Sequence, residues 1–281
     1  MERETLFPEV RALLAARQTA GIVALSQCVS PAAWADVIPS LTTREVITLV
    51  QALPETVLRW VLADLAPTEA ATILRNLTHT EAANVLEAMA PDDATDVVDE
   101  LPEAEAERIL VAMRPDDAAE IRELLAYPPD SAGGLMTPAF VAISPDLRAD
   151  QAIAALRRVA AEAETMSYVY VVDDAEHLLG VLSLHSLVLA APPTPVSALM
   201  APEVIRVRAG DPAADAARLL RDRNLLAVPV VDDANRLLGI VTADDAIDVL
   251  EDELADDLLR MAGTDAEEMD RRSPAQVARL R

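Results

Sequence analysis

A twelve-residue hydrophobic repeat in the first half of this chain narrows its possible folds more than any other feature. An apolar residue recurs at this interval, without slippage, at Leu41, Leu53, Leu65, Leu77, Met89, Leu101 and Met113. A turn signal follows most of them, as in Leu53-Pro54-Glu55 and Ala90-Pro91-Asp92-Asp93. Proline fits the first turn of a helix, and a nearby Thr or Asp can cap its free amides. Each repeat therefore predicts a helix of about eight to ten residues followed by a tight turn.

Helices this short are marginally stable alone in water, so neighbouring repeats must stack to bury their apolar faces. We therefore expect an α-helical superhelix or solenoid over residues 1–128, which includes a further helix near residues 8–20. Paired prolines and paired glycines between Tyr127 and Gly134 end this array.

A second repeat, with a period of about 60 residues, follows the helical array. Leu135-Met136-Thr137-Pro138 recurs as Leu199-Met200-Ala201-Pro202, and Val171-Val172-Asp173-Asp174 recurs as Val230-Val231-Asp232-Asp233. Each copy predicts a short strand, a helix, two strands around an Asp-Asp turn and a closing helix. The predicted strands are 140–143, 168–172 and 180–183 in the first copy and 204–207, 227–231 and 239–242 in the second. The chain is thus expected to be α+β and multidomain, with a pseudo-symmetric pair of β-α-β-β-α units and a crevice between them.

A dense run of acidic residues closes the second copy. Residues 244–257 contain eight carboxylates and no basic side chain. Ile247, Leu250 and Leu254 recur within the run at helical spacing, so it predicts a helix with one apolar face. Acids three or four residues apart on a helix repel one another. Such a run either solvates a surface or binds a cation, and its tight clustering favours the cation.

The overall charge balance excludes several kinds of partner. The formal net charge is −25, and all 23 basic residues are arginine. A chain this acidic is unsuited to binding nucleic acid or anionic lipid, because both need a basic surface. Cys28 is the sole cysteine, so a disulfide framework is ruled out and a reducing cytoplasm is the expected setting. From its acidic start we expect no signal peptide, and from the lack of a long apolar stretch we expect no membrane-spanning helix within residues 1–281.

The second repeat resembles a tandem pair of cystathionine-β-synthase-type (CBS) modules. The resemblance lies in the two Leu-Met-x-Pro segments, the Val-Val-Asp-Asp turns and the Leu-Leu-Gly strands. Together with the helical array, the stretch 131–138 and the acidic exit 241–253, the chain is similar to the cytosolic half of the MgtE family of magnesium channel-transporters. This similarity implies a first CBS domain at 129–196, a second at 197–253 and a connecting "plug" helix at 254–281. It also implies a membrane pore downstream of Arg281, with the chain at the cytoplasmic face of the cell membrane.

The same resemblance implies a mechanism and a set of metal ligands. In that family, two protomers pair through their CBS modules as a homodimer. Intracellular Mg²⁺ binds between acidic faces and favours the closed pore. The positions that match the family's acids here are Asp92, Asp96, Asp245, Asp248, Glu253, Asp256 and Asp257. Asn224 stands where some relatives carry an acid. A simpler reading of Asp92 and Asp93 is that they stabilise a helix start.

Two other classes of function stay open from the sequence. Some CBS pairs bind adenine nucleotides through a Thr or Ser followed three residues later by an Asp. Thr242 and Asp245 keep that pattern, whereas Ser183 is followed by Ser186. ATP is therefore a candidate ligand, and a soluble nucleotide-sensing CBS protein is the rival interpretation. The third class is a protein-docking scaffold whose acids serve solubility. We expect no enzymatic activity, because Ser183, His185 and Ser186 have no orienting acid nearby in the sequence.

Overall fold

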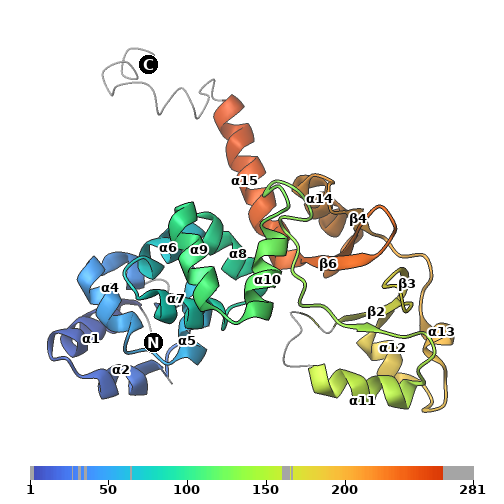
Figure 1. The fold of residues 1–281 in the computed structure, drawn as a ribbon, viewed down its shortest axis with the longest axis horizontal. Helices are drawn as coiled ribbons and strands as arrows, with labels where there is room; N and C mark the ends of the chain where they lie inside the picture. The colour runs from blue at the N-terminus through green and yellow to red at the C-terminus, as the bar shows by residue number, and fades with distance from the viewer. Residues whose placement is uncertain are drawn as a thin grey trace. The chain divides into compact units, whose positions relative to one another are not determined.

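The chain forms two compact units, Met1–Ala126 and Tyr127–Arg281, each of which is described by itself (Figure 1). The structure is a computed structural model, and it describes residues 3–26, 28–30, 33–34, 37–63, 65–159, 165 and 167–261. The predicted plug helix at 254–281 therefore lies largely outside the described residues.

The first unit consists of short helices whose lengths follow the twelve-residue repeat. After the 3₁₀ turn Ile38–Ser40, seven helices of eight to ten residues succeed one another along the described chain. They are α4 Thr43–Val50, α5 Glu55–Ala63, α6 Pro67–Leu74, α7 His79–Leu86, α8 Pro91–Asp99, α9 Glu103–Ala112 and α10 Pro115–Leu124. Helices two apart pack together, α4 on α6 on α8 on α10 and α5 on α7 on α9, so the array has two layers. The predicted helical superhelix is confirmed.

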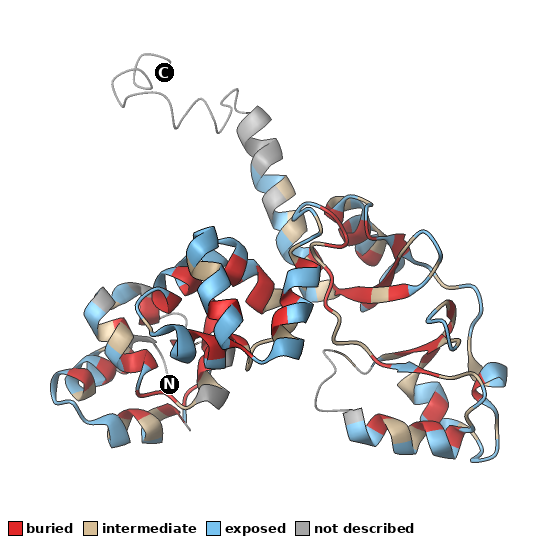
Figure 2. Ribbon diagram, viewed as in Figure 1, coloured by how far each residue is buried: buried red, intermediate tan, exposed pale blue. Residues whose placement is uncertain are grey.

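The recurring apolar residue of the repeat lies just after a helix, where it packs into the core between the layers. Leu53, Leu65, Leu101 and Met113 are buried, and Leu41, Leu77 and Met89 pack against the same core. Figure 2 shows buried and exposed residues succeeding one another along these helices, as expected when each helix turns one face inward. Each repeat is thus one helix and one core-filling turn.

Capping residues fix where several of these helices begin. Thr42 and Thr78 form capping boxes with Glu45 and Glu81, in which side chain and backbone exchange hydrogen bonds. These bonds from Thr42, together with Arg11 at 2.9 Å, lower the pKa of Glu45 to about 2. By contrast, α6, α8 and α10 each begin with a proline, which has no backbone N–H and so leaves one fewer donor to be capped.

The N-terminal helix differs from the prediction of one helix near residues 8–20. The structure has two helices, α1 Arg3–Ala15 and α2 Thr19–Ser26. Arg17 has a φ of 52°, in the left-handed region that a continuous helix cannot include. The single predicted helix was therefore wrong, because the break falls at an arginine and not at a Gly or Pro that the sequence would reveal.

The second unit contains two modules with the same order of elements (Figure 1). In each, a two-residue strand runs parallel to a central strand, which pairs antiparallel with a third strand. The first module has β1 Ala142–Ile143, α11 Ala149–Val159, β2 Tyr168–Val172, β3 Leu178–Ser183 and α12 Leu184–Leu189. After α13 Val196–Leu199, the second has β4 Val207–Arg208, α14 Ala213–Arg223, β5 Ala227–Val231, β6 Leu237–Thr242 and α15 Ala243–Met261. The β-α-β-β-α prediction is confirmed.

The boundaries of some strands depart from the prediction. The first strand of each module spans two residues and not the predicted 140–143 and 204–207. Only these residues pair with the central strand, Ala142 with Tyr170 and Val207 with Val230. The third strands begin two residues earlier than predicted, because an irregularity in the pairing lets Leu178 and Leu237 join the sheets.

Each Leu-Met-x-Pro segment pairs with the third strand of the other module. Thr137 of the first segment forms two backbone hydrogen bonds with Ile240 on β6, and Ala201 of the second forms two with Val181 on β3. The glycines of the Leu-Leu-Gly strands leave room for these segments. A Cβ on Gly239 would lie 2.9 Å from the Met136 side chain and from the Thr137 carbonyl oxygen. The two sequence motifs of each copy are therefore the two sides of one contact, and they interlock the modules.

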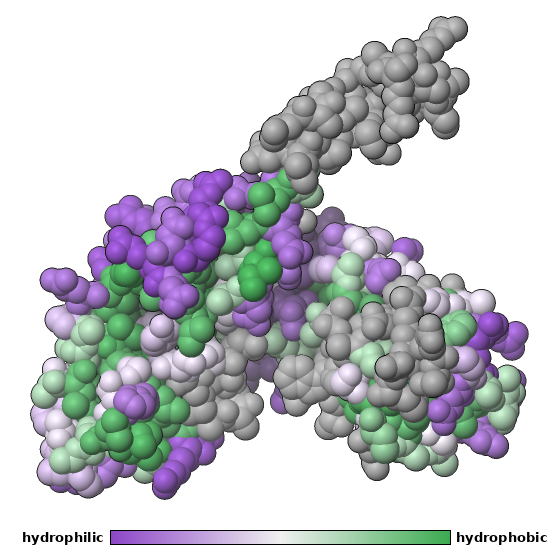
Figure 3. Space-filling model, turned by 180° about the vertical axis from the view of Figure 1, so that it is seen from behind, coloured by the Kyte–Doolittle hydropathy of each residue, from purple (hydrophilic) through white to green (hydrophobic). Residues whose placement is uncertain are grey.

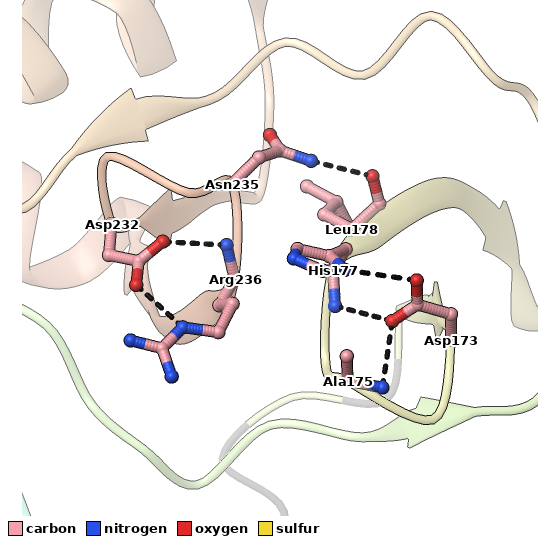
Figure 4. A network of polar contacts seen from close by, with 7 residues as sticks. All are labelled: Asp173, Ala175, His177, Leu178, Asp232, Asn235 and Arg236. Atoms are coloured by element: carbon pink, nitrogen blue, oxygen red, sulfur yellow. Dashed lines mark hydrogen bonds and ion pairs between the residues drawn. The ribbon is translucent and has the colours of Figure 1, made fainter.

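The Asp-Asp turns of the two modules also meet (Figure 4). Leu178 and Leu237 donate backbone hydrogen bonds to the carbonyls of Asn235 and Glu176, and the Asn235 amide donates to the Leu178 carbonyl. Asp173 bonds to His177, and Asp232 bonds to Arg236, in equivalent turns. These hydrogen bonds lower the pKa of both Asp173 and Asp232. Asp173 and Asp232 therefore have a structural role within their own turns, and we do not count them among the candidate metal ligands.

Candidate metal-binding surfaces

The acidic run lies on α15, which begins directly after strand β6. Ala246 packs inward and is buried, whereas Asp244, Asp248 and Glu251 are exposed. Asp245 and Glu253 are half-buried. Asp256 and Asp257 are on the same helix, but their side chains lie outside the described residues. The described part of α15 therefore presents several carboxylates to solvent along two to three turns.

Two of the predicted ligands on α15 are engaged by neighbouring side chains. The buried Thr242 hydroxyl donates a short hydrogen bond to the Asp245 carboxylate, which ties the first turn of α15 to the end of β6. Glu253 accepts a hydrogen bond of 2.6 Å from the Arg218 guanidinium on α14, and Arg218 also contacts Asp215 at 3.2 Å. Sequence reasoning missed Arg218, because 35 residues separate it from Glu253.

The first module ends its third strand in a related way but without an acid. Ser183 caps α12 by accepting a hydrogen bond of 3.0 Å from the backbone of Ser186, and the two hydroxyls are 2.8 Å apart. Of these two strand-to-helix junctions, the second alone carries a carboxylate at the fourth position. That difference matters for a nucleotide, whose ribose hydroxyls need an acceptor.

The second acidic surface is on α8 of the helical unit. Asp92 and Asp93 lie in its first turn and are half-buried, and Asp96 is exposed one turn later. Residues four apart on a helix share a face, so Asp92 and Asp96 are neighbours. Ala94, Val97 and Val98 bury the other face of α8 in the core. The helix therefore turns its apolar residues inward and Asp96 to solvent, while Asp92 and Asp93 lie half-buried at its start.

Asn224 has a structural role at the end of α14. It is the C-cap of that helix and has a φ of 51°, in the left-handed region. Asparagine enters this region more easily than most residues other than glycine. The choice of Asn at this position is therefore explained by the turn.

The donor chemistry of these surfaces suits a hard, hydrated cation. Carboxylate oxygens are the ligands Mg²⁺ prefers, and the ion usually keeps several waters and takes one or two carboxylates. Among the described residues, no three His, Cys, Asp or Glu side chains gather closely enough to form a protein cage for a metal ion. The described acids therefore fit sites of one or two carboxylates at which the ion keeps water ligands.

Comparison with known proteins identifies both units. Residues 29–130 match the family model of the MgtE intracellular N domain, and residues 132–192 and 196–252 each match the CBS domain model. The magnesium transporter MgtE of Thermus thermophilus is 43% identical over 150 residues, which cover 53% of this chain and 33% of that protein. Its counterpart in Enterococcus faecalis is 45% identical over the same length and coverage. The match thus spans about a third of the curated relatives, which are named as transporters and not as enzymes.

Solved structures match nearly the whole chain. The soluble part of a magnesium transporter has a TM-score of 0.83 and 33% identity, covering 90% of this chain and 99% of that one. The cytosolic domain of the Mg²⁺ channel MgtE in complex with ATP has a TM-score of 0.82 and 34% identity, covering 86% and 98%. In the part of the chain that the structure describes, no helix is both long and apolar enough to span a membrane. The chain belongs to the MgtE family of magnesium transporters and corresponds to the part solved as the soluble or cytosolic domain of its relatives.

Proposed function

We propose that this chain is the Mg²⁺-sensing regulatory region of a magnesium channel or transporter, at the cytoplasmic face of the cell membrane. In this proposal, Mg²⁺ binding to its acidic surfaces favours the closed state of a pore encoded beyond Arg281. The observation that carries it is the acid-rich surface of α15, within a chain of net charge −25 whose similar structures come from magnesium transporters.

Electrostatics supplies the response to the ion. Without divalent cations, the carboxylates within α15 repel one another, as do those within α8, and this self-repulsion disfavours compact states of the chain. A bound Mg²⁺ supplies two positive charges and orients water against the carboxylates. Asp245, Asp248 and Glu253 on α15 and Asp92 and Asp96 on α8 are the ligands we propose, with Asp256 and Asp257 extending the set. Sites of one or two carboxylates bind weakly, as a sensor of a cellular ion concentration requires.

The proposal includes a homodimer formed through the CBS modules. The closing helices of both modules expose large apolar side chains: Val188 and Leu189 on α12 are 60% and 72% exposed, and Ile247 and Leu254 on α15 are 55% and 64% exposed. Figure 3 shows hydrophobic surface beside strongly polar surface where α15 leaves this unit. Large apolar side chains exposed on the closing helix of each module are what the surface of a partner would cover. A second copy of this chain is the partner we propose.

Thermal unfolding tests the proposed function directly. Because a ligand that binds only the folded state stabilises it, about 10 mM MgCl₂ should raise the unfolding midpoint by a few degrees at constant ionic strength. NaCl at the same ionic strength is the control for general screening, and it should give a smaller rise. An unchanged midpoint in MgCl₂ relative to NaCl would count against Mg²⁺ sensing.

Nucleotide binding is the second candidate, and the bond between Thr242 and Asp245 favours it. This pair places a hydroxyl and a carboxylate where β6 meets α15, and Tyr168 offers an aromatic ring on β2. One of the similar structures is a complex with ATP. Adding millimolar ATP with EDTA to the same unfolding assay separates the candidates. A rise with ATP that is lost in Thr242→Val supports the nucleotide site, and the absence of any rise with ATP retires it.

A further inference from the structure

One ligand predicted for the cation already has a positively charged partner. The Arg218 guanidinium lies 2.6 Å from the Glu253 carboxylate, and its other terminal nitrogen lies 3.2 Å from Asp215. The Glu253 side chain is 33% exposed and that of Arg218 is 49% exposed, so solvent reaches both. Because α14 packs along α15, the protein itself places a positively charged side chain, Arg218, against the acidic helix.

We propose that Arg218 competes with Mg²⁺ for Glu253 and thereby sets the Mg²⁺ concentration at which α15 responds. This inference rests on the proposed function. Arg218 contacts one of the two Glu253 oxygens, and its positive charge opposes a second cation at the same carboxylate, so part of the Mg²⁺ binding free energy is used to displace the guanidinium. Asp215, one turn before Arg218 on α14, holds the displaced guanidinium close by. When the Mg²⁺ concentration falls, Arg218 returns to Glu253.

The backbone around Arg218 is positioned so that the side chain alone needs to move. The loop before α14 is held by the segment that opens this unit: the Ala132 amide donates to the Asp211 carbonyl at 2.7 Å, and the Ala213 amide donates to the Asp130 carbonyl at 2.9 Å. The inner face of α14 is packed into the protein, with Ala216, Ala217 and Leu220 buried. A half-exposed side chain on a fixed helix can exchange between two carboxylates without unfolding either helix.

The same helix offers a matched control. Arg221 also lies on α14 and is exposed, and among the described residues its ion pair is with the adjacent Asp222 at 2.9 Å. Arg221→Gln therefore removes the same charge from the same helix and leaves the Glu253 pair intact. Arg218→Lys keeps the positive charge and serves as the conservative variant.

The test is a Mg²⁺ titration of the whole chain followed by isothermal calorimetry and by the unfolding midpoint at constant ionic strength. Arg218→Gln should lower the half-saturating Mg²⁺ concentration by about two- to fivefold, the range expected from losing one exposed ion pair. Arg221→Gln should leave it near the wild-type value, and Arg218→Lys should restore most of the difference.

The outcomes separate this inference from the proposed function. If wild type responds to Mg²⁺ but Arg218→Gln has the wild-type half-saturation, the competition is wrong while Mg²⁺ sensing stands. If Arg221→Gln shifts the titration as much as Arg218→Gln does, the effect is general charge removal and the inference is overturned. If wild type itself does not respond, both the proposed function and the inference fail.

Discussion

Replacing four acids with their amides is expected to abolish most of the stabilisation by Mg²⁺. In the variant Asp92→Asn, Asp96→Asn, Asp245→Asn and Asp248→Asn, each amide keeps an oxygen but loses the charge that attracts the ion. We expect the rise in unfolding midpoint in about 10 mM MgCl₂ to fall from a few degrees to under about one degree. Differential scanning fluorimetry of the two proteins, with and without MgCl₂, measures this difference.

Charge removal alone must be separated from loss of the sites, because the chain carries a large negative charge. The control replaces four exposed acids elsewhere, Glu103→Gln, Glu123→Gln, Asp146→Asn and Asp174→Asn. Both variants lose the same charge, so both lose the same general self-repulsion. The control should keep the wild-type response to Mg²⁺. Equal loss of response in both variants would mean that the ion acts by screening and not at these surfaces.

The second large effect is expected at the contact that interlocks the CBS modules. Gly239→Ala places a methyl group 2.9 Å from the Met136 side chain and from the Thr137 carbonyl oxygen. The methionine side chain can move, but the Thr137 backbone is held by two hydrogen bonds to the backbone of Ile240. We expect a loss of about 1–3 kcal/mol in the unfolding free energy of this unit, as for other overpacked cores.

Gly210→Ala is the matched control for this substitution. Nothing lies within 4 Å of a Cβ at Gly210, and its backbone is not in the left-handed region. The change there should be neutral or stabilising by about 0.4–1 kcal/mol, through the unfolded chain. Chemical denaturation monitored by circular dichroism compares the two variants. A Gly239→Ala protein as stable as Gly210→Ala would show that the Met136 segment does not hold the modules together.

Local patterns predicted the elements that depend on local residues. The twelve-residue repeat predicted α4 to α10 because each turn contains its own proline or threonine cap. The continuous apolar runs before the Asp-Asp turns placed β2 and β5 at their observed bounds, 168–172 and 227–231. The two-residue strands β1 and β4 were placed inaccurately, since so short a pairing leaves no periodicity to read. The break at Arg17 depends on a backbone conformation that its side chain does not signal.

The candidate site shows the same division between local and distant contacts. The Thr242-x-x-Asp245 pattern is local, and the structure joins these two side chains by a hydrogen bond. The pairing of Glu253 with Arg218 depends on how α14 packs along α15, which no short stretch of sequence encodes. Likewise, Met136 and Gly239 were each recognised as part of a motif, but their contact crosses from one module to the other. The roles of Asp92, Asp96, Asp245, Asp248, Glu253, Asp256 and Asp257 as metal ligands stay predictions.

The most direct test of the account is small-angle X-ray scattering of this chain in chelator and in excess Mg²⁺. If divalent cations neutralise the acidic surfaces of the two units, the radius of gyration should decrease in about 10 mM MgCl₂ relative to EDTA at matched ionic strength. The four-acid variant should show little decrease. An identical scattering curve for the wild-type chain in EDTA and in MgCl₂ would contradict the proposal that Mg²⁺ occupancy controls how compact the region is.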